Sequence, residues 1–171
     1  VRETDNLQPM TKHVSRKVKK KGQIEFDLVE INWKDVGFVP DDKNIEGSAG
    51  YIFTVTDALT GLLWAKFSPT KERKNITPIA EEGFKWLSKK LNTPISKMFG
   101  MSDFGSEFDF KKYKTWGLRT KQIARASRIE MKNKQIQAAL YRIIKMNNSK
   151  HIGTLIKNAM TIVNRTKSSL T

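Results

Sequence analysis

The feature that most constrains the fold of this chain is a series of short apolar segments that precede any helical pattern. Residues 24–31 form an apolar segment of strand length, and residues 51–57 form a second one, rich in β-branched and aromatic side chains. A turn around Thr60-Gly61 separates the second segment from a third at residues 62–67, which predicts a hairpin. The chain is therefore expected to build a sheet that contains this hairpin.

Three longer segments with helical periodicity follow the predicted strands. Thr77 is expected to be the N-cap of the first helix and Pro78 its first residue, and Pro94 is expected to stop it. Residues 127–146 predict the second helix, and a third begins near Ile152. The apolar positions that predict their buried faces are Ala80, Phe84, Leu87, Leu91, Ile129, Ile136, Leu140, Ile143, Ile152, Leu155, Ile156, Ala159 and Val163.

The segments between these elements carry weaker patterns. Residues 95–101 form a short apolar run that predicts a strand, and residues 108–116 predict a short helix. Residues 34–49 are polar and rich in turn formers, which predicts a long loop, and residues 117–126 show no clear period, which predicts a mobile loop. The order of elements predicts an α/β fold in which helices flank a mixed sheet.

Composition limits the size of the protein and the kinds of metal site it can hold. The 171 residues fit one domain, and 38% hydrophobic with 29% charged residues is typical of a soluble globular protein. No apolar run is long enough to cross a membrane, and no signal-peptide pattern opens the chain. The chain has no cysteine and only two histidines, so a metal ion is expected to be held mainly by oxygen.

The charge of the chain favours nucleic acid as a partner. The net charge is +15, and a protein that neutralises phosphates releases counterions condensed on them. Residues 27–57 carry seven acids and two lysines, whereas residues 111–134 carry nine basic residues and one acid, Glu130. Residues 1–22 contain the basic run at 16–21 and predict a flexible arm that contacts DNA or is solvated, ahead of a core at 23–171.

Three acids occupy positions where a carboxylate is either unfavourable to bury or well placed to bind a ligand. Asp27 lies inside an apolar strand, Asp103 follows an apolar run beside Gly105, and Glu130 stands alone among basic residues near a helix start. Carboxylate oxygens suit Mg²⁺ or Mn²⁺. Each acid also has a structural explanation: a solvated strand face for Asp27, a turn for Asp103, and the helix dipole for Glu130.

Four segments in this order resemble the integrase catalytic core of retroviruses, retrotransposons and the Maverick/Polinton DNA transposons. The segments are residues 24–29, 54–65, 102–108 and 129–134, and the resemblance runs from about residue 24 to residue 163. The segment around Asp103 is the most specific of the four. The interval from Asp103 to Glu130 is shorter than in retroviral integrases, and Phe104 and Met131 replace the family's usual polar residues.

The resemblance implies a ribonuclease H-like fold and a DDE-type active site. Asp27, Asp103 and Glu130 would hold two Mg²⁺ or Mn²⁺ ions, with Glu107 as a less favoured substitute for Glu130. Asn133 matches a family position, whereas Asp57 is expected to recur in the family without binding metal. The residues expected to contact DNA are Arg119, Lys121, Arg125, Arg128 and Lys134, although Lys134 also fits a surface pair with Glu130.

The expected function is DNA integration, in which the ends of a mobile element are processed and then joined to target DNA. The expected partners are DNA and further copies of the chain, with no membrane, and the expected location is the nucleus of a eukaryotic host or otherwise the cell interior. Two alternatives stay open. One is a metal-dependent nuclease of the same fold, and the other is an inactive, DNA-binding relic of an integrase.

Overall fold

The computed structural model describes residues 22–31, 50–103, 105–124, 126–146 and 151–168. The predicted N-terminal arm, the predicted loop at residues 34–49 and Arg125 lie outside the described residues, apart from Gly22 at the end of the arm. Within the described ranges no helix is both long and apolar enough to span a membrane.

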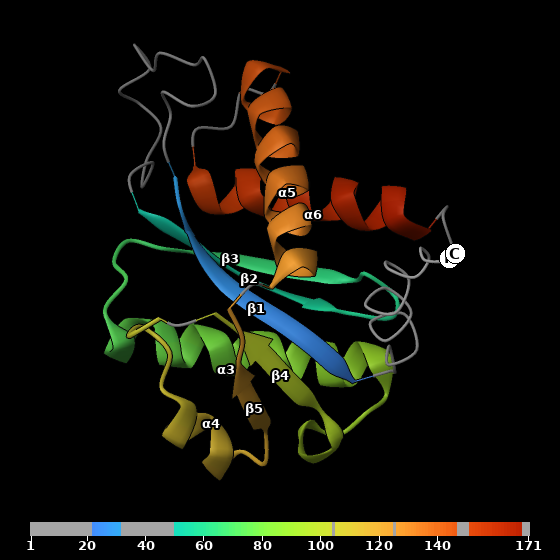
Figure 1. The fold of residues 1–171 in the computed structure, drawn as a ribbon. Coiled ribbons are helices and arrows are strands. Elements are labelled where there is room, and N and C mark those ends of the chain that lie inside the picture. Colours follow the sequence, from blue (N-terminus) through green and yellow to red (C-terminus); the bar gives the residue numbers. More distant parts are fainter. Residues whose placement is uncertain (1–21, 32–49, 104, 125, 147–150, 169–171) are drawn as a thin grey trace, which may run out of the picture.

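A five-stranded mixed sheet forms the centre of the structure (Figure 1), in the order β3-β2-β1-β4-β5. Strands β1 (Gln23–Glu30), β2 (Tyr51–Asp57) and β3 (Leu63–Ser68) are antiparallel neighbours, and the pair β2 and β3 forms the predicted hairpin. On its other side β1 pairs in parallel with β4 (Phe99–Ser102), which pairs in parallel with β5 (Arg119–Gln122). The predicted mixed α/β architecture is thus confirmed.

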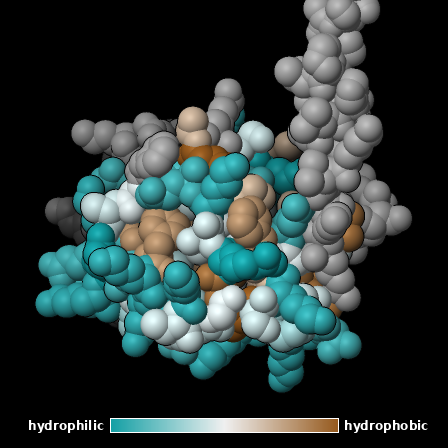
Figure 2. Space-filling view, turned by 60° about the horizontal axis from the view of Figure 1, so that its bottom comes forward, coloured by the Kyte–Doolittle hydropathy of each residue, from teal (hydrophilic) through white to brown (hydrophobic). Residues whose placement is uncertain are grey.

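Helices cover both faces of this sheet (Figure 1). Helix α3 (Arg73–Leu91) packs on one face of β2 and β3, while α5 (Ser127–Met146) and α6 (Ile152–Ser168) pack on the other. The short helix α4 (Phe110–Thr115) lies beside β5, close to the predicted range. Figure 2 shows the face that carries α3 and α4, where small apolar patches are separated by hydrophilic surface.

Each face of the sheet has its own apolar core, because successive side chains of a strand point to opposite faces. On the α3 face Phe26 lies at the centre of an aromatic cluster with Phe53, Phe84, Phe108 and Tyr113. On the other face the apolar stripes of α5 and α6 pack against Ile52, Leu63 and Ala65. Every apolar position predicted for the three long helices is buried.

The start of the first long helix was predicted wrongly. Helix α3 begins at Arg73, so Pro78 lies inside it rather than at its first position. The first turn forms earlier, because the amides of Asn75 and Ile76 donate to the carbonyl of Glu72. The side chain of Ile76 is buried in the core, which stabilises this turn. The hydroxyl of Thr77 donates to the carbonyl of Arg73 instead of capping the helix, at 2.7 Å. Tertiary packing here outweighs the local preference of proline for a first turn.

The prediction of a mobile loop at residues 117–126 was also wrong for the middle of that range, because residues 119–122 form β5. This edge strand is mostly exposed on both faces, so it shows no alternation of apolar and polar residues. Its backbone pairing with β4 holds it in the sheet. The predicted strand at residues 95–101 divides into a 3-10 turn, η2 (Ile95–Lys97), and β4.

Candidate functional site

Two acids predicted from the sequence lie on or directly after two adjacent strands, Asp27 within β1 and Asp103 after β4. Strand β1 is parallel to β4, and Glu25 pairs with Met101, so Asp27 and Asp103 come two residues later on each chain segment. Side chains two residues apart point to the same face, so Glu25, Asp27 and Met101 lie on the face covered by α5. Asp103 follows directly after the end of β4, where the chain leaves the sheet. The topology therefore places the two acids at one level of adjacent strands.

A chain of side-chain hydrogen bonds ties Asp27 to helix α5. The amide nitrogen Nδ2 of Asn133 donates to Oδ2 of Asp27 at 3.1 Å. Oδ1 of the same Asn133 accepts a bond from the hydroxyl of Thr54 at 2.6 Å. Thr54 lies opposite Asp27 on β2, and both Thr54 and Asn133 are buried. Because both ends of the Asn133 amide are bonded, its donor is directed at the Asp27 carboxylate.

The carboxyl group of Asp27 titrates far above its usual range. Burial is the main reason that the pKa of Asp27 is raised to about 6, and the charges of Asp103 and Glu107 act in the same direction, whereas the bonds from Leu28 and Asn133 lower it. The backbone N–H of Leu28 donates to Oδ1 of Asp27 at 2.7 Å. A half-buried carboxylate beside two like charges is stabilised by any cation that reaches it.

Glu130, the third predicted metal ligand, lies on the first turn of α5 near Glu25. Oε1 of Glu25 accepts from the backbone N–H groups of Arg128 and Ile129 at 3.0 and 3.1 Å. Burial raises the pKa of Glu25, and the charge of Glu130 raises it as well. Glu25 thus caps the N-terminus of α5 from strand β1, on the sheet face that α5 covers.

Among the residues that the structure describes, no three Asp, Glu or His side chains are grouped as a three-ligand metal site would require. The pair Asp27 and Asp103 still fits Mg²⁺, which is usually bound by one or two carboxylates together with water and substrate phosphates. The role of Glu130 as a third ligand stays a prediction.

Four of the predicted DNA-contacting residues, Arg119, Lys121, Arg128 and Lys134, lie within the described part of the chain. Arg119 and Lys121 are exposed on β5, and Arg128 is half-buried on the first turn of α5. Lys134 is exposed one helical turn beyond Glu130, as expected. Asp57, by contrast, is fully buried and accepts bonds from the backbone and hydroxyl of Thr60, both at 2.8 Å. Asp57 therefore shapes the β2–β3 turn.

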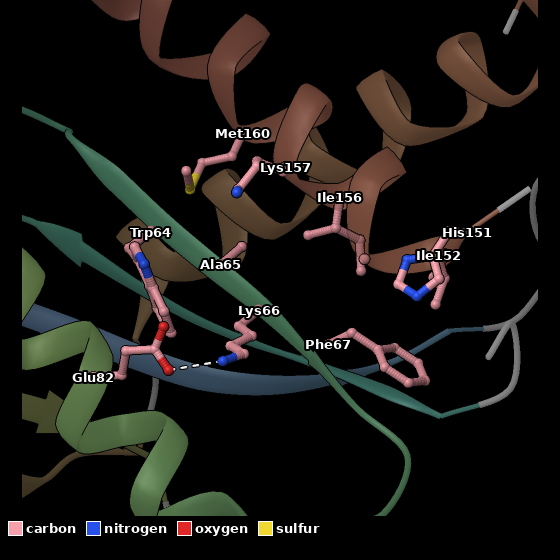
Figure 3. Close-up of a pocket in the computed structure, with 11 residues that line it drawn as sticks. Trp64, Ala65, Lys66, Phe67, Glu82, His151, Ile152, Ile156, Lys157 and Met160 are labelled. Atoms are coloured by element: carbon pink, nitrogen blue, oxygen red, sulfur yellow. Dashed lines mark hydrogen bonds and ion pairs between the residues drawn. The ribbon is translucent and has the colours of Figure 1, made fainter. Parts of the chain in front are cut away.

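Two sizeable cavities lie on the surface of the described residues. The first, of about 610 Å³, lies along the outer edge of the sheet between β3, α3 and α6. Figure 3 shows Lys66 bonded to Glu82 on its floor, at 2.7 Å, with Lys157 and His151 on its far wall. The second, of about 540 Å³, lies between β4, β5 and the start of α5. Of these two, only the second reaches the candidate site, because Glu25 is part of its lining.

Sequence reasoning missed Glu25 and Thr54 as parts of this site. Glu25 is almost fully buried although it is charged, and Thr54 orients Asn133 through its hydroxyl. The alternation along β1 places Glu25 on the same face as Asp27, and this signal was available in the sequence. The contact between Glu25 and the amides of α5 spans more than one hundred residues and has no local pattern.

Asp27→Asn is expected to stabilise the folded protein at neutral pH. The folded pKa of about 6 lies above the ordinary value of 3.8, so the folded state binds the proton more tightly than the unfolded state. The wild type therefore loses stability as pH rises from about 4 to about 6, and the variant does not. We expect the variant to be more stable by about 1–3 kcal/mol above pH 7, with no difference below about pH 4.

Urea denaturation across this pH range measures the effect, with the exposed strand-end residue Glu30→Gln as the matched control. The Asn133 amide can turn over and accept a bond from the new carboxamide while donating to Thr54, so the bonded chain is kept. Equal stability of variant and wild type at pH 8 would contradict the raised pKa of Asp27.

Comparison with known proteins does not assign this chain to a family. No protein-family model matches the chain, and no curated protein sequence matches it.

Proposed function

We propose that this chain is a metal-dependent polynucleotidyl transferase core of ribonuclease H-like fold, which processes and joins DNA ends in the manner of an integrase. One observation carries the proposal. Asp27 on β1 and Asp103 directly after the adjacent parallel strand β4 are each two residues beyond the register pair Glu25 and Met101, and Asn133 of the covering helix donates to Asp27. The strand order, with a hairpin on one side of β1 and parallel strands on the other, supports this fold type.

The acids of the site would bind the metal ions, and Asn133 would orient one of these acids. Asp27 and Asp103 would hold Mg²⁺ or Mn²⁺, and Glu130 would complete the set as the resemblance implies. Two bound ions supply activation of the attacking oxygen and stabilisation of the leaving oxygen in an in-line phosphoryl transfer. Asn133 keeps the Asp27 carboxylate in one orientation through its bond at 3.1 Å. A fixed carboxylate avoids reorganisation during the reaction, which is where preorganised sites gain rate.

Basic side chains near these acids would bind the DNA backbone. Arg119, Lys121 and Arg128 line the same face of the sheet as Asp27, and Lys134 lies further along α5. Phosphate contacts of this kind position a duplex without reading its sequence. In the proposed reaction water attacks a phosphodiester near an element's end, and the freed 3′ hydroxyl then attacks target DNA. We also propose that the chain works as a dimer or higher oligomer.

A specific observation favours one rival function, that of a DNA-binding protein without catalysis. No three acids or histidines are grouped within the described ranges, and Glu130 influences the pKa of Glu25. A relic that keeps its basic surface and has lost a complete ligand set would show such an arrangement. Binding and chemistry therefore have to be measured separately.

An end-joining assay distinguishes the functions. The chain is incubated in Mn²⁺ with a supercoiled plasmid and labelled duplexes that carry 3′ hydroxyl ends and randomised terminal base pairs. We expect the label to enter plasmid-sized products, with omission of Mn²⁺ and the Asp103→Asn variant as negative controls. Shortened duplexes without joined products would indicate a nuclease. Retention of DNA in a filter-binding assay, without either product, would indicate a relic and contradict the proposed activity.

A further inference from the structure

The second cavity combines an apolar floor with a cationic rim directly beside the candidate site. On β4, Phe99 and Met101 point to the same face, and on β5 so do their register partners Arg119 and Lys121. Phe99, Met101 and Lys121 line the cavity. Helix α5 covers β1 and β2, and α6 covers β3, so this face of β4 and β5 opens into the cavity. The floor is therefore apolar along β4, with Gln23 and Glu25 of β1 beside it, and the outer edge is basic.

The start of α5 forms the inner wall of this cavity. Arg128 and Met131 line it from the first turns of the helix, and the side chain of Met131 is 56% exposed despite being apolar. The amides of Arg128 and Ile129 at this helix N-terminus already donate to Glu25, so these two amides are not available to a phosphate. The positive charge comes from side chains instead, chiefly Lys121 and Arg128.

We propose that this cavity binds one unpaired nucleotide of a DNA strand, next to the phosphate that reacts. The base would lie against Phe99, Met101 and Met131, and Lys121 and Arg128 would contact the flanking phosphates. Aromatic side chains with neighbouring cations are the usual platform for unpaired bases. The guanidinium of Arg119 lies 5.9 Å from the centre of the Phe99 ring, so a cation is already held at this platform.

The distance to the acids fits a nucleotide that neighbours the reacting one. Asp27 and Asp103 lie two residues beyond Glu25 and Met101, which is about 7 Å along a strand. A strand that passes from the cavity to the acids would thus present its next phosphate at Asp27 and Asp103. The placement of that phosphate at the acids rests on the proposed function. Binding of a nucleotide in the cavity can be tested without catalysis.

The test measures binding of fluorescein-labelled oligothymidylate to the whole chain by anisotropy in the absence of divalent metal. Phe99→Leu removes the aromatic face and keeps an apolar side chain, and we expect it to weaken binding about tenfold. Met131→Glu adds a charge at an exposed position and is expected to have a similar effect. Lys121→Gln should lower the slope of log affinity against log salt by about 0.7. Lys89→Gln, exposed on α3, is the matched control and should change neither quantity.

An oligomer of the same length without bases separates stacking from charge. The wild type should bind it about tenfold more weakly than oligothymidylate, and Phe99→Leu should bind both alike. Equal binding of both oligomers by the wild type, or variants that bind like Lys89→Gln, would overturn the inference. A second contrary result is that polyglutamate displaces the DNA from the wild type but not from Phe99→Leu. That result would also overturn the inference, because the cavity would then suit an acidic protein segment. These outcomes leave the end-joining assay untouched, so the two proposals fail separately.

Discussion

Asp103→Asn should lower the rate of metal-dependent cleavage and joining of DNA by about 10³-fold or more. The neutral amide keeps the shape of the side chain and removes the charge that would hold a cation with Asp27. Folding should survive, because the charge of Asp103 raises the pKa of Asp27 and its loss relieves that repulsion. Product formation in Mn²⁺ measures the activity, and thermal unfolding measures the fold.

Three other acids serve as comparisons in the same assay. Glu30→Gln removes an exposed carboxylate from the end of β1 and should leave the rate unchanged. Glu130→Gln should reduce the rate as strongly as Asp103→Asn if Glu130 is the third ligand, as predicted. Glu107→Gln tests the alternative, since the charge of Glu107 also acts on Asp27. An Asp103→Asn protein that retains wild-type activity would contradict the role of this carboxylate.

Phe26→Ala should destabilise the protein by about 3–5 kcal/mol, a large share of the stability of a domain this size. Phe26 is fully buried, and its ring lies 5.1 Å from that of Phe108 and 5.5 Å from that of Phe84. The substitution leaves a cavity at the centre of the α3 face, directly beneath the strand that carries Asp27. Urea denaturation gives the free energy of unfolding from the shift of the midpoint.

Phe110→Ala is the matched control for this cluster. The ring centre of Phe110 also lies 6.2 Å from that of Phe26, but Phe110 is only partly buried at the rim of the core. Its loss should cost distinctly less than that of Phe26, because water and neighbouring side chains can occupy the space it leaves. Equal costs for the two substitutions would show that Phe26 is not the centre of this core.

Strong local patterns made the main elements predictable from the sequence. Strand β2 and helix α5 were predicted with the bounds that the structure shows, β2 from its β-branched and aromatic residues and α5 from its helical period. The buried stripes of α3, α5 and α6 followed from the same periodicity. Strand β5 could not be predicted in this way, since an exposed edge strand of four residues carries no apolar signal.

The candidate site was predictable only in part. Asp27 was predictable as a site residue because a charge inside an apolar strand is costly, and in the structure the charge of Asp103 acts on it. The bonds from Asn133 to Asp27 and from Thr54 to Asn133 join three separate elements, so no local pattern reveals them. The early start of α3 shows the same limit, because burial of Ile76 decides it.

Metal binding by Asp27 and Asp103 is tested most directly by the anomalous signal of Mn²⁺ in crystals of the chain. We predict a peak about 2 Å from one carboxylate oxygen of Asp27 and one of Asp103, and its absence in crystals of Asp103→Asn. A further contact from Glu130 would complete the predicted ligand set. Crystals saturated with Mn²⁺ that show peaks only elsewhere, or none at these two carboxylates, would contradict the proposed metal site and the catalysis built on it.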